Sequence, residues 1–230
     1  MPTVQDLGAA TATAVVDPMT WAPLSAGLVF GVTGLDESLS DWATDHRPIF
    51  ASADRAAGIS DVLRAGLLAG AAASSVLAPA PPTGAGGSAL AARLTANLLA
   101  YGTTRMSVDG LKAAVGRERP NRENDRSLPS GHAGIAFNAA ALIERNFAHA
   151  ALSPRDRRAM RLGAYGLAGT TAWARLEAGK HFPSDVLVGA ALGNFLARFW
   201  SRAVSGPRSR PPWAIEADSD RLVVRLGGSL

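Results

Sequence analysis

This sequence of 230 residues lacks cysteine, which excludes disulfide bonds, thiolate chemistry and cysteine-based zinc sites. Lysine is scarce as well, since only two of the 23 basic residues are lysines and the others are arginines. Charged residues make up 18% of the chain, whereas hydrophobic residues make up 47%. A chain of this length and composition can bury one sizeable core, which predicts a single folded domain.

The positive charge of the chain does not predict a nucleic-acid partner. The formal net charge is +4 and the isoelectric point lies near 10.3. However, the basic residues are scattered along the chain, and 19 acidic residues lie among them. Because nucleic-acid binding normally requires a clustered basic surface, we expect no binding to DNA or RNA.

Long uninterrupted hydrophobic runs are also missing. No lysine or arginine precedes Arg47, so residues 1–17 do not have the basic start of a secretory signal. Residues 18–35 and 65–92 carry no charge, but prolines interrupt both, and a membrane-spanning helix needs about 20 mostly apolar residues. The mean hydropathy is only +0.10. Both a soluble helical core and a weakly hydrophobic, membrane-associated bundle are compatible with this pattern.

The spacing of apolar residues is helical almost throughout, which predicts an all-α fold built as a single helical bundle. Gly116 is placed to end one helix, and Ser153 followed by Pro154 is placed to begin another. Residues 221–226 alternate as in a short β-strand, with an unstructured tail as the alternative. We expect about six helices, at residues 23–34, 53–76, 88–115, 131–149, 154–177 and 183–204.

Proline and arginine concentrate in residues 206–212, which predicts the end of the bundle there. We therefore divide the chain into a helical domain, residues 1–206, and a C-terminal tail, residues 207–230. Within the domain, the residues that carry chemistry lie between 112 and 195. Residues 18–100 contain no such motif, and we expect them to determine substrate specificity.

Three short blocks contain the residue types that a metal-free phosphate-transfer site requires. The blocks are Lys112 with Arg119 and Pro120; Pro129, Ser130, Gly131 and His132; and Arg175 with His181 and Asp185. Together they supply three cations, two imidazoles and one carboxylate. Only two of the four histidines of the chain lie in these blocks.

The cationic residues and the second block predict an anion-binding cradle. Ser130 is a natural N-cap, and the backbone amides that follow it would point at an anion, with Gly131 allowing a close approach. Lys112 lies near one helix end and Arg119 just beyond it, so both could reach one ligand. An arginine supplies a planar fork for two phosphate oxygens, whereas a lysine supplies a point charge.

The third block predicts a histidine oriented by a carboxylate. Pro183 suits the first turn of a helix, which leaves His181 in the preceding loop and Asp185 about one turn further on. Asp185 could therefore accept a hydrogen bond from one ring nitrogen and leave the other nitrogen free. A histidine in this arrangement is a nucleophile or a base.

Each block taken alone has a simpler interpretation. Ser130 can be only a helix cap, and Asp185 can be a first-turn acid that complements the helix dipole. Three complementary blocks in one order favour catalysis instead. The remaining side chains near these blocks are interpreted as solvated helix-end residues, namely Arg117, Arg122 and Arg126. The two other histidines, His46 and His149, are interpreted as surface or packing residues.

These blocks resemble the motifs of the type 2 phosphatidic acid phosphatase superfamily, which also contains the vanadium-dependent haloperoxidases. The resemblance runs from Lys112 to about Phe195, and the first two motifs match completely. The third motif usually begins Ser-Arg, whereas Ala174 precedes Arg175 here, so a hydroxyl is lost beside the site. We interpret this difference as tolerated, with an effect on phosphate affinity.

The resemblance implies a helical bundle and a two-step phosphohydrolase that needs no metal and no other cofactor. His181 would attack phosphorus and form a phosphohistidine, while Asp185 would orient its ring. His132 would protonate the leaving alkoxide and then take a proton from the attacking water. The phosphate oxygens would be held by Lys112, Arg119, Ser130, Gly131 and Arg175.

The resemblance further implies a phosphate ester as the partner, with a lipid phosphate favoured and a soluble phosphomonoester also compatible. It favours a bacterial cell envelope or membrane as the location, and a soluble cytoplasmic or periplasmic protein is compatible too. The oligomeric state does not follow from the sequence.

Two alternative functions are compatible with the same residues. A vanadate-dependent haloperoxidase would bind vanadate, a phosphate mimic, on the same histidine, although this chain is short for that group. A non-catalytic helical protein that binds polyanions or membranes would keep the anion cradle without turnover. Halide oxidation by peroxide after vanadate loading would identify the first, and phosphate binding without hydrolysis would identify the second.

Overall fold

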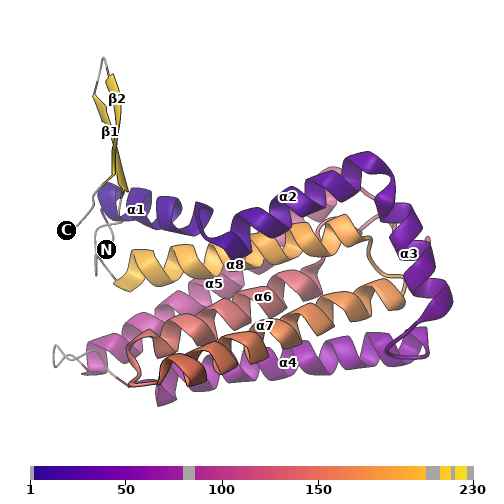
Figure 1. The fold of residues 1–230 in the computed structure, drawn as a ribbon, viewed down its shortest axis with the longest axis horizontal. Coiled ribbons are helices and arrows are strands. Elements are labelled where there is room, and N and C mark those ends of the chain that lie inside the picture. Colours follow the sequence, from indigo (N-terminus) through magenta and orange to yellow (C-terminus); the bar gives the residue numbers. More distant parts are fainter. Residues whose placement is uncertain (1–2, 80–85, 206–212, 219–220, 227–230) are drawn as a thin grey trace.

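The computed structural model describes residues 3–79, 86–205, 213–218 and 221–226, and these form a helical bundle with one C-terminal hairpin (Figure 1). The predicted all-α class is confirmed, with eight α-helices in the described residues rather than about six. The helices are α1 (Val4–Val15), α2 (Pro18–Thr33), α3 (Leu35–His46), α4 (Ala53–Leu77), α5 (Gly86–Val115), α6 (Gly131–Asn146), α7 (Pro154–Glu177) and α8 (Pro183–Ser205). A short 3-10 helix, Phe147–His149, follows α6.

Two helices that the apolar pattern did not predict, α1 and α3, account for the difference in number. In α1, Thr3 and Asp6 form a capping box in which each side chain accepts a hydrogen bond from the backbone amide of the other. Gly34 precedes α3 and has a φ of 75°, a left-handed conformation that glycine adopts readily. Small residues dominate α1 and polar residues dominate α3, so each contains only a few large apolar side chains.

The other six helices lie close to their predicted positions, and α2 differs most. It begins at Pro18 rather than at residue 23 because Asp17 caps it, accepting a hydrogen bond from the amide of Met19 at 3.0 Å. Pro23 lies inside this helix. The prolines of this region therefore begin and continue a helix instead of interrupting it.

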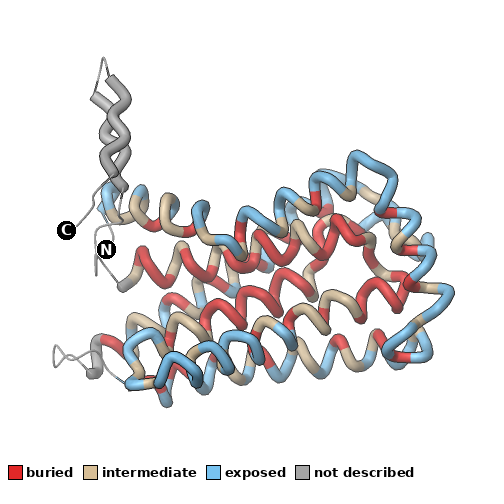
Figure 2. The backbone as a smooth tube through the Cα atoms, viewed as in Figure 1, coloured by how far each residue is buried: buried red, intermediate tan, exposed pale blue. Residues whose placement is uncertain are grey.

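Five long helices, α4 to α8, run side by side and form the body of the bundle (Figure 1). α8 packs against α5, α6 and the N-terminal helices α1 and α2, and α6 packs in addition against α4 and α7. α3 runs across one end of the bundle between α2 and α4 (Figure 1). Buried residues concentrate on α6 and α8, which form the centre of the molecule (Figure 2).

Glycine and alanine allow α6 and α8 to approach each other closely. A Cβ atom on Gly193 would overlap with the carbonyl oxygen of Gly134, and a Cβ atom on Gly189 would overlap with that of Ser130. The main core cluster around this contact consists mostly of alanines. Because Ser130 lies at the N-terminal end of α6, this contact fixes that end against α8.

Local backbone signals place the three motif blocks at helix ends. Gly116, with a φ of 60°, follows the last residue of α5, and Ser153 caps α7, both as predicted. Ser130 is the N-cap of α6, and its Oγ accepts a hydrogen bond of 3.5 Å from the amide of Ala133. Pro183 is the first residue of α8, also as predicted.

The predicted strand at residues 221–226 is confirmed as β2 (Arg221–Leu226). It pairs in an antiparallel hairpin with β1 (Trp213–Asp218), which the sequence pattern did not predict. The predicted bundle end at residues 206–212 lies outside the described residues.

Candidate active site

The three predicted blocks meet at the end of the bundle that α3 crosses. Lys112 lies in the last turn of α5, Ser130 and His132 lie at the start of α6, and Arg175 lies in the last turn of α7. Asp185 lies in the first turn of α8 and accepts, through its backbone carbonyl, a hydrogen bond of 2.9 Å from the amide of Ser130. These helix ends lie together in the fold (Figure 1), so the candidate residues surround one region.

Two of the three candidate cations of this region, Arg119 and Arg175, keep a buried donor without a hydrogen-bond partner among the described residues. Nζ of Lys112 donates to the carbonyl oxygen of Arg126 at 2.7 Å, and Nη1 of Arg175 donates to Oγ of Ser60 at 3.1 Å. Burial and the charge of Arg119 lower the pKa of Lys112 to about 8 and that of Arg175 to about 10. Nε of Arg119 and Nε of Arg175 are buried without a hydrogen-bond partner among the described residues. Because unpaired buried donors are costly, an anion bound between them would be stabilising.

His181 is almost fully buried in the loop before α8. Burial lowers its pKa to about 4, the charges of Lys112 and Arg175 act in the same direction, and Asp185 opposes them. The imidazole is therefore neutral at neutral pH and has a free lone pair on one ring nitrogen. A neutral ring beside two cations is suited to attack a bound phosphate.

The carboxylate of Asp185 does not accept the hydrogen bond from His181 that the sequence predicts, and it has other partners. Its Oδ1 accepts from Arg117 at 2.8 Å, and its Oδ2 accepts from Oγ of Ser127 at 2.5 Å and from the amide of Phe182 at 2.8 Å. Nδ1 of His181 lies 3.7 Å from Oδ2, which is too long for a hydrogen bond. The predicted hydrogen bond is therefore absent from this pair, because two other donors occupy Oδ2.

These contacts keep Asp185 ionised although it is buried. Burial by itself opposes ionisation, but His181, Ser127 and Arg117 together outweigh it and lower the pKa of Asp185. A fixed negative charge consequently lies beside the ring of His181. It can stabilise a positive charge on that ring without a direct hydrogen bond.

Arg117 is not a solvated helix-end residue, and this interpretation of the sequence was wrong. Its guanidinium bridges Asp185 and Asp36, with a distance of 2.9 Å from Nη2 to Oδ2 of Asp36, and it lies 4.2 Å from the ring centroid of Phe182. Asp36 lies in the first turn of α3 and also accepts a hydrogen bond of 2.7 Å from the amide of Ser184. Arg117 thus joins α3 to the first turn of α8.

We expect Arg117→Met to destabilise the protein, because it leaves two carboxylates, Asp36 and Asp185, without their shared cation. The free energy of unfolding should fall by about 3 kcal/mol, the scale seen when one partner of a buried ion pair is removed. Urea denaturation followed by circular dichroism measures it. The control is Arg122→Met, because Arg122 is an exposed residue of the same loop. Equal stability of the two variants would contradict the bridging role.

His132 lies at the rim of the region and contacts a residue outside the motifs. Its Nε2 is 2.7 Å from Oδ1 of Asp61 on α4, and the same oxygen accepts a hydrogen bond of 3.2 Å from Arg64. Ser60, the partner of Arg175, precedes Asp61 on the same helix. Reasoning from motifs missed Asp61, Ser60 and Asp36, because no sequence pattern marks them and only the fold brings them to the site.

Two small motif residues have tight surroundings. A Cβ atom on Gly131 would lie 3.3 Å from Cγ1 of Val108, so little space is left for a larger residue there. Ala174, at the position where a serine is usual, is fully buried in an apolar cluster with Phe50, Ala56 and Ala178. The structure explains how an alanine is accommodated at this position.

Three side chains that we interpreted as lying outside the site are exposed on the surface. Arg122 and Arg126 are exposed, as predicted. His46 is also exposed, and its ring stacks on Trp42 with 5.2 Å between the centroids. Among the described residues, no three His, Cys, Asp or Glu side chains come together in a group that could hold a metal ion.

Comparisons with known proteins identify a family and a similar fold. The sequence model of the PAP2 superfamily matches residues 91–209. The fold is similar to a crystal structure of a transmembrane PAP2 type phosphatidylglycerolphosphate phosphatase from Bacillus subtilis, with a TM-score of 0.58 and 23% identity over 80% of this chain and 92% of that chain. A crystal structure of LpxE from Aquifex aeolicus matches with a TM-score of 0.38 and 24% identity over 46% of this chain and 64% of that chain. No curated protein sequence matches the chain.

Proposed function

The chain belongs to the PAP2 superfamily and is a phosphatase of that family, and we propose that it hydrolyses a lipid phosphate through a phosphohistidine on His181 without a metal ion. The observation that carries this proposal is the buried imidazole of His181 close to cations, two of which keep an unpaired donor. Nε of Arg119 and Nε of Arg175 have no hydrogen-bond partner among the described residues, although both are buried. A phosphate group would accept from these donors and lie within reach of the imidazole.

In the first step, a ring nitrogen of His181 attacks phosphorus while the bond from phosphorus to the ester oxygen breaks. His132 donates a proton to the leaving oxygen, which departs as an alcohol. The ring of His181 gains positive charge as the new bond forms, and the carboxylate of Asp185 stabilises that charge. The cations Lys112, Arg119 and Arg175 stabilise the equatorial phosphate oxygens, a role that needs no metal.

In the second step, water hydrolyses the phosphohistidine. His132, which has lost its proton, takes one from the attacking water, and inorganic phosphate leaves as His181 is restored. A positioned acid and base of this kind contributes about 10²- to 10⁴-fold to the rate. The cycle needs no redox step and no cofactor. Vanadate should compete with the substrate for the anion-binding cradle, because it mimics the phosphoryl group.

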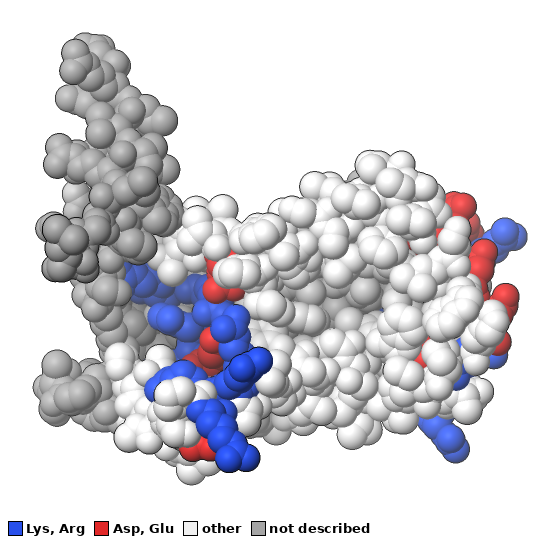
Figure 3. All heavy atoms as spheres, viewed as in Figure 1, with Lys and Arg blue, Asp and Glu red and all other residues white. Residues whose placement is uncertain are grey.

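The outer surface supports association with a membrane and hence a lipid substrate. α4 is long and apolar enough to cross a membrane, and α1 and α2, which meet at 58°, meet the same criterion as a pair. Figure 3 shows a wide band without charged side chains in the middle of the visible face, with charges at the two ends. Large apolar side chains are exposed on several helices, among them Leu28, Val32, Val62, Leu98, Met106 and Leu162. Exposed apolar surfaces of this extent are typical of contact with lipid or protein.

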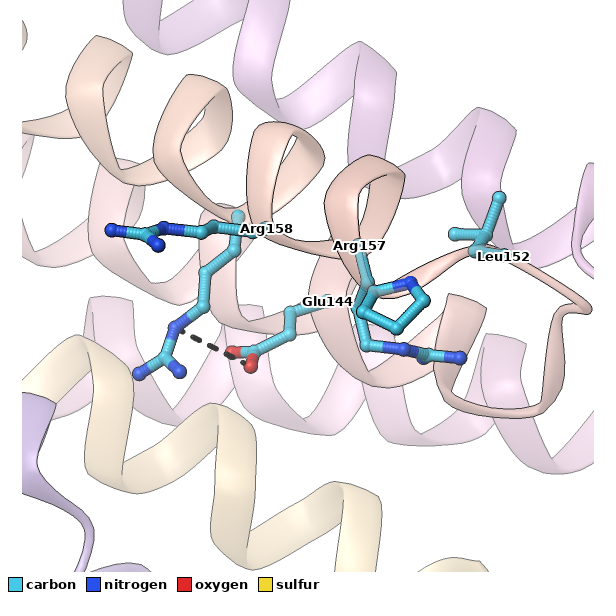
Figure 4. A pocket seen from close by; sticks show the side chains of 6 residues that line it. Glu144, Leu152, Arg157 and Arg158 are labelled. Carbon is cyan, nitrogen blue, oxygen red and sulfur yellow. Dashed lines mark ion pairs between the residues drawn. The ribbon is translucent and has the colours of Figure 1, made fainter.

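The end of the bundle opposite the candidate site is rich in arginine and suits the anionic headgroups of a membrane surface. A hollow of about 500 Å³ there is lined by Glu144 together with Arg157, Arg158 and Arg161 of α7. Figure 4 shows Arg157 and Arg158 extending in different directions beside Glu144, which forms an ion pair of 3.6 Å with Arg161. The substrate class that we propose is a membrane lipid with a terminal phosphate, such as phosphatidate, phosphatidylglycerol phosphate or a polyprenyl diphosphate.

We expect the purified protein to release inorganic phosphate from lipid phosphates in excess EDTA. The measurement compares phosphatidate, phosphatidylglycerol phosphate and a polyprenyl diphosphate in detergent with soluble phosphomonoesters. Release should persist in EDTA, because the cationic side chains replace a metal, and the lipid esters should be preferred. Loss of release in EDTA would contradict the metal-independent mechanism. Equal rates for all the esters would contradict the proposed lipid specificity.

The alternative functions give different results in the same assays. A haloperoxidase would oxidise halide with peroxide after vanadate loading and would release no phosphate. A binding protein would retain phosphate without hydrolysis, and His132→Ala would then behave like the wild type.

A further inference from the structure

Asp61 is an acidic residue outside the family motifs that contacts the candidate general acid. Its Oδ1 lies 2.7 Å from Nε2 of His132, and its side chain is 57% exposed whereas that of His132 is 21% exposed. It comes from α4, which precedes the region that the family model matches, residues 91–209. The pair therefore links the N-terminal part of the chain to the reaction centre.

The surroundings of His132 disfavour the protonated ring that a general acid requires. The charged side chains that act on it are Asp61 and Arg64 from α4 and Arg175 from α7. Burial, Arg175 and Arg64 lower the pKa of His132 to about 4, and Asp61 opposes them. At pH 7 a histidine with this pKa is protonated in only about one molecule in a thousand. Asp61 is thus the side chain among these three that stabilises the imidazolium.

The exposure of the two side chains indicates how they can work together. The carboxylate of Asp61 is accessible to water, and its Oδ1 is within hydrogen-bond distance of Nε2 of His132. The other ring nitrogen is then the one that can exchange a proton with the leaving oxygen and with the attacking water. A carboxylate that fixes the orientation and tautomer of a histidine in this way also stabilises the charged ring.

We propose that Asp61 is a positioning residue for His132, which holds the ring through Nε2 and favours the protonated form that gives its proton to the leaving group. The inference rests on the proposed phosphatase function. During the first step the proton passes from His132 to the ester oxygen as the bond to phosphorus breaks, and Asp61 keeps its negative charge throughout. In the second step the ring regains a proton from water.

The variant Asp61→Asn tests the proposal, because it keeps the size of the side chain and removes its charge. Its rate is compared with that of the wild type on substrates with different leaving groups. A lipid phosphate has a poor leaving group that needs a proton, whereas p-nitrophenyl phosphate has a good one that does not. We expect kcat to fall about 10- to 100-fold with the lipid phosphate, and about 3-fold or less with p-nitrophenyl phosphate. The matched control is Asp54→Asn, an exposed acid in the first turn of the same helix, which should retain both rates.

The pH profile should change in a defined direction. His132 must be protonated when it acts as the acid, so activity on a poor leaving group falls as pH rises through its pKa. Asp61→Asn removes the group that raises this pKa, so the falling limb should move to lower pH. An equal loss of rate with both substrates, or an unchanged falling limb, would overturn the positioning role.

A titration of the His132 ring by NMR separates this inference from the proposed function, because it requires no turnover. His132→Ala identifies the signal, and circular dichroism confirms that each variant is folded. A lower pKa in Asp61→Asn than in the wild type and in Asp54→Asn is the expected result. If the wild type hydrolyses no phosphate ester, the proposed function fails, but the titration still decides whether Asp61 controls His132. An unchanged pKa would overturn the inference even in an active enzyme.

Discussion

His181→Ala is expected to reduce phosphate release to the background rate. In the proposed mechanism His181 supplies the atom that bonds to phosphorus, so no other side chain can replace it. The loss should be about 10⁴-fold or more in kcat, since nucleophile and acid act as one unit. Initial rates of phosphate release in EDTA from the preferred lipid phosphate measure it.

A control variant and a trapping experiment make this result specific. His46→Ala alters an exposed histidine that stacks on Trp42, so its rate should match the wild type. Rapid mixing with substrate labelled at phosphorus, followed by an alkaline quench, should recover label on the wild-type protein and none on His181→Ala. Turnover of His181→Ala at the wild-type rate would refute the phosphohistidine mechanism.

The second large effect is expected from Gly193→Ala at the contact between α6 and α8. The new Cβ would overlap with the carbonyl oxygen of Gly134, a backbone atom that cannot rotate away. The two helices must therefore separate or bend. The free energy of unfolding should fall by about 3 kcal/mol, the upper part of the usual range for overpacking. Chemical denaturation measures this change.

Gly163→Ala provides the matched control for this prediction. Gly163 also lies inside a helix, α7, but an added Cβ there would meet nothing within 4 Å. Alanine favours a helix over glycine by about 1 kcal/mol, so this variant should be as stable as the wild type or more stable. If Gly193→Ala were equally stable, the close contact between α6 and α8 would be disproved.

The sequence predicts the parts of this structure that depend on local signals. Several helix ends marked by a cap, a proline or a glycine were predicted, as at Ser130, Ser153 and Gly116, because each signal acts within a few residues. The cap and proline at Asp17 and Pro18, which begin α2, were missed. The motif residues are also found together at one end of the bundle. Their catalytic roles remain predictions that the variants above test.

The contacts that the sequence did not predict are those between distant segments. Arg117 was interpreted as a solvated residue because Asp36, its partner, lies 81 positions earlier, in a helix with few large apolar side chains. Asp61 carried no signal either, since an exposed acid on an apolar helix is ordinary in a sequence. Charged pairs of this kind depend on the packing of whole helices, which the local pattern does not determine.

The bridges from α3 and α4 to the site also bear on the order of folding. Ser184 and Asp36 are separated by 148 positions, Arg175 and Ser60 by 115, and His132 and Asp61 by 71. Contacts of such high sequence separation close large loops, so they form late in folding and at an entropic cost. A fragment that begins at α5 would contain every motif residue but neither Asp36 nor Asp61. Recovery of catalysis after denaturation is thus expected to report the docking of the N-terminal helices, and to lag behind the recovery of helix content.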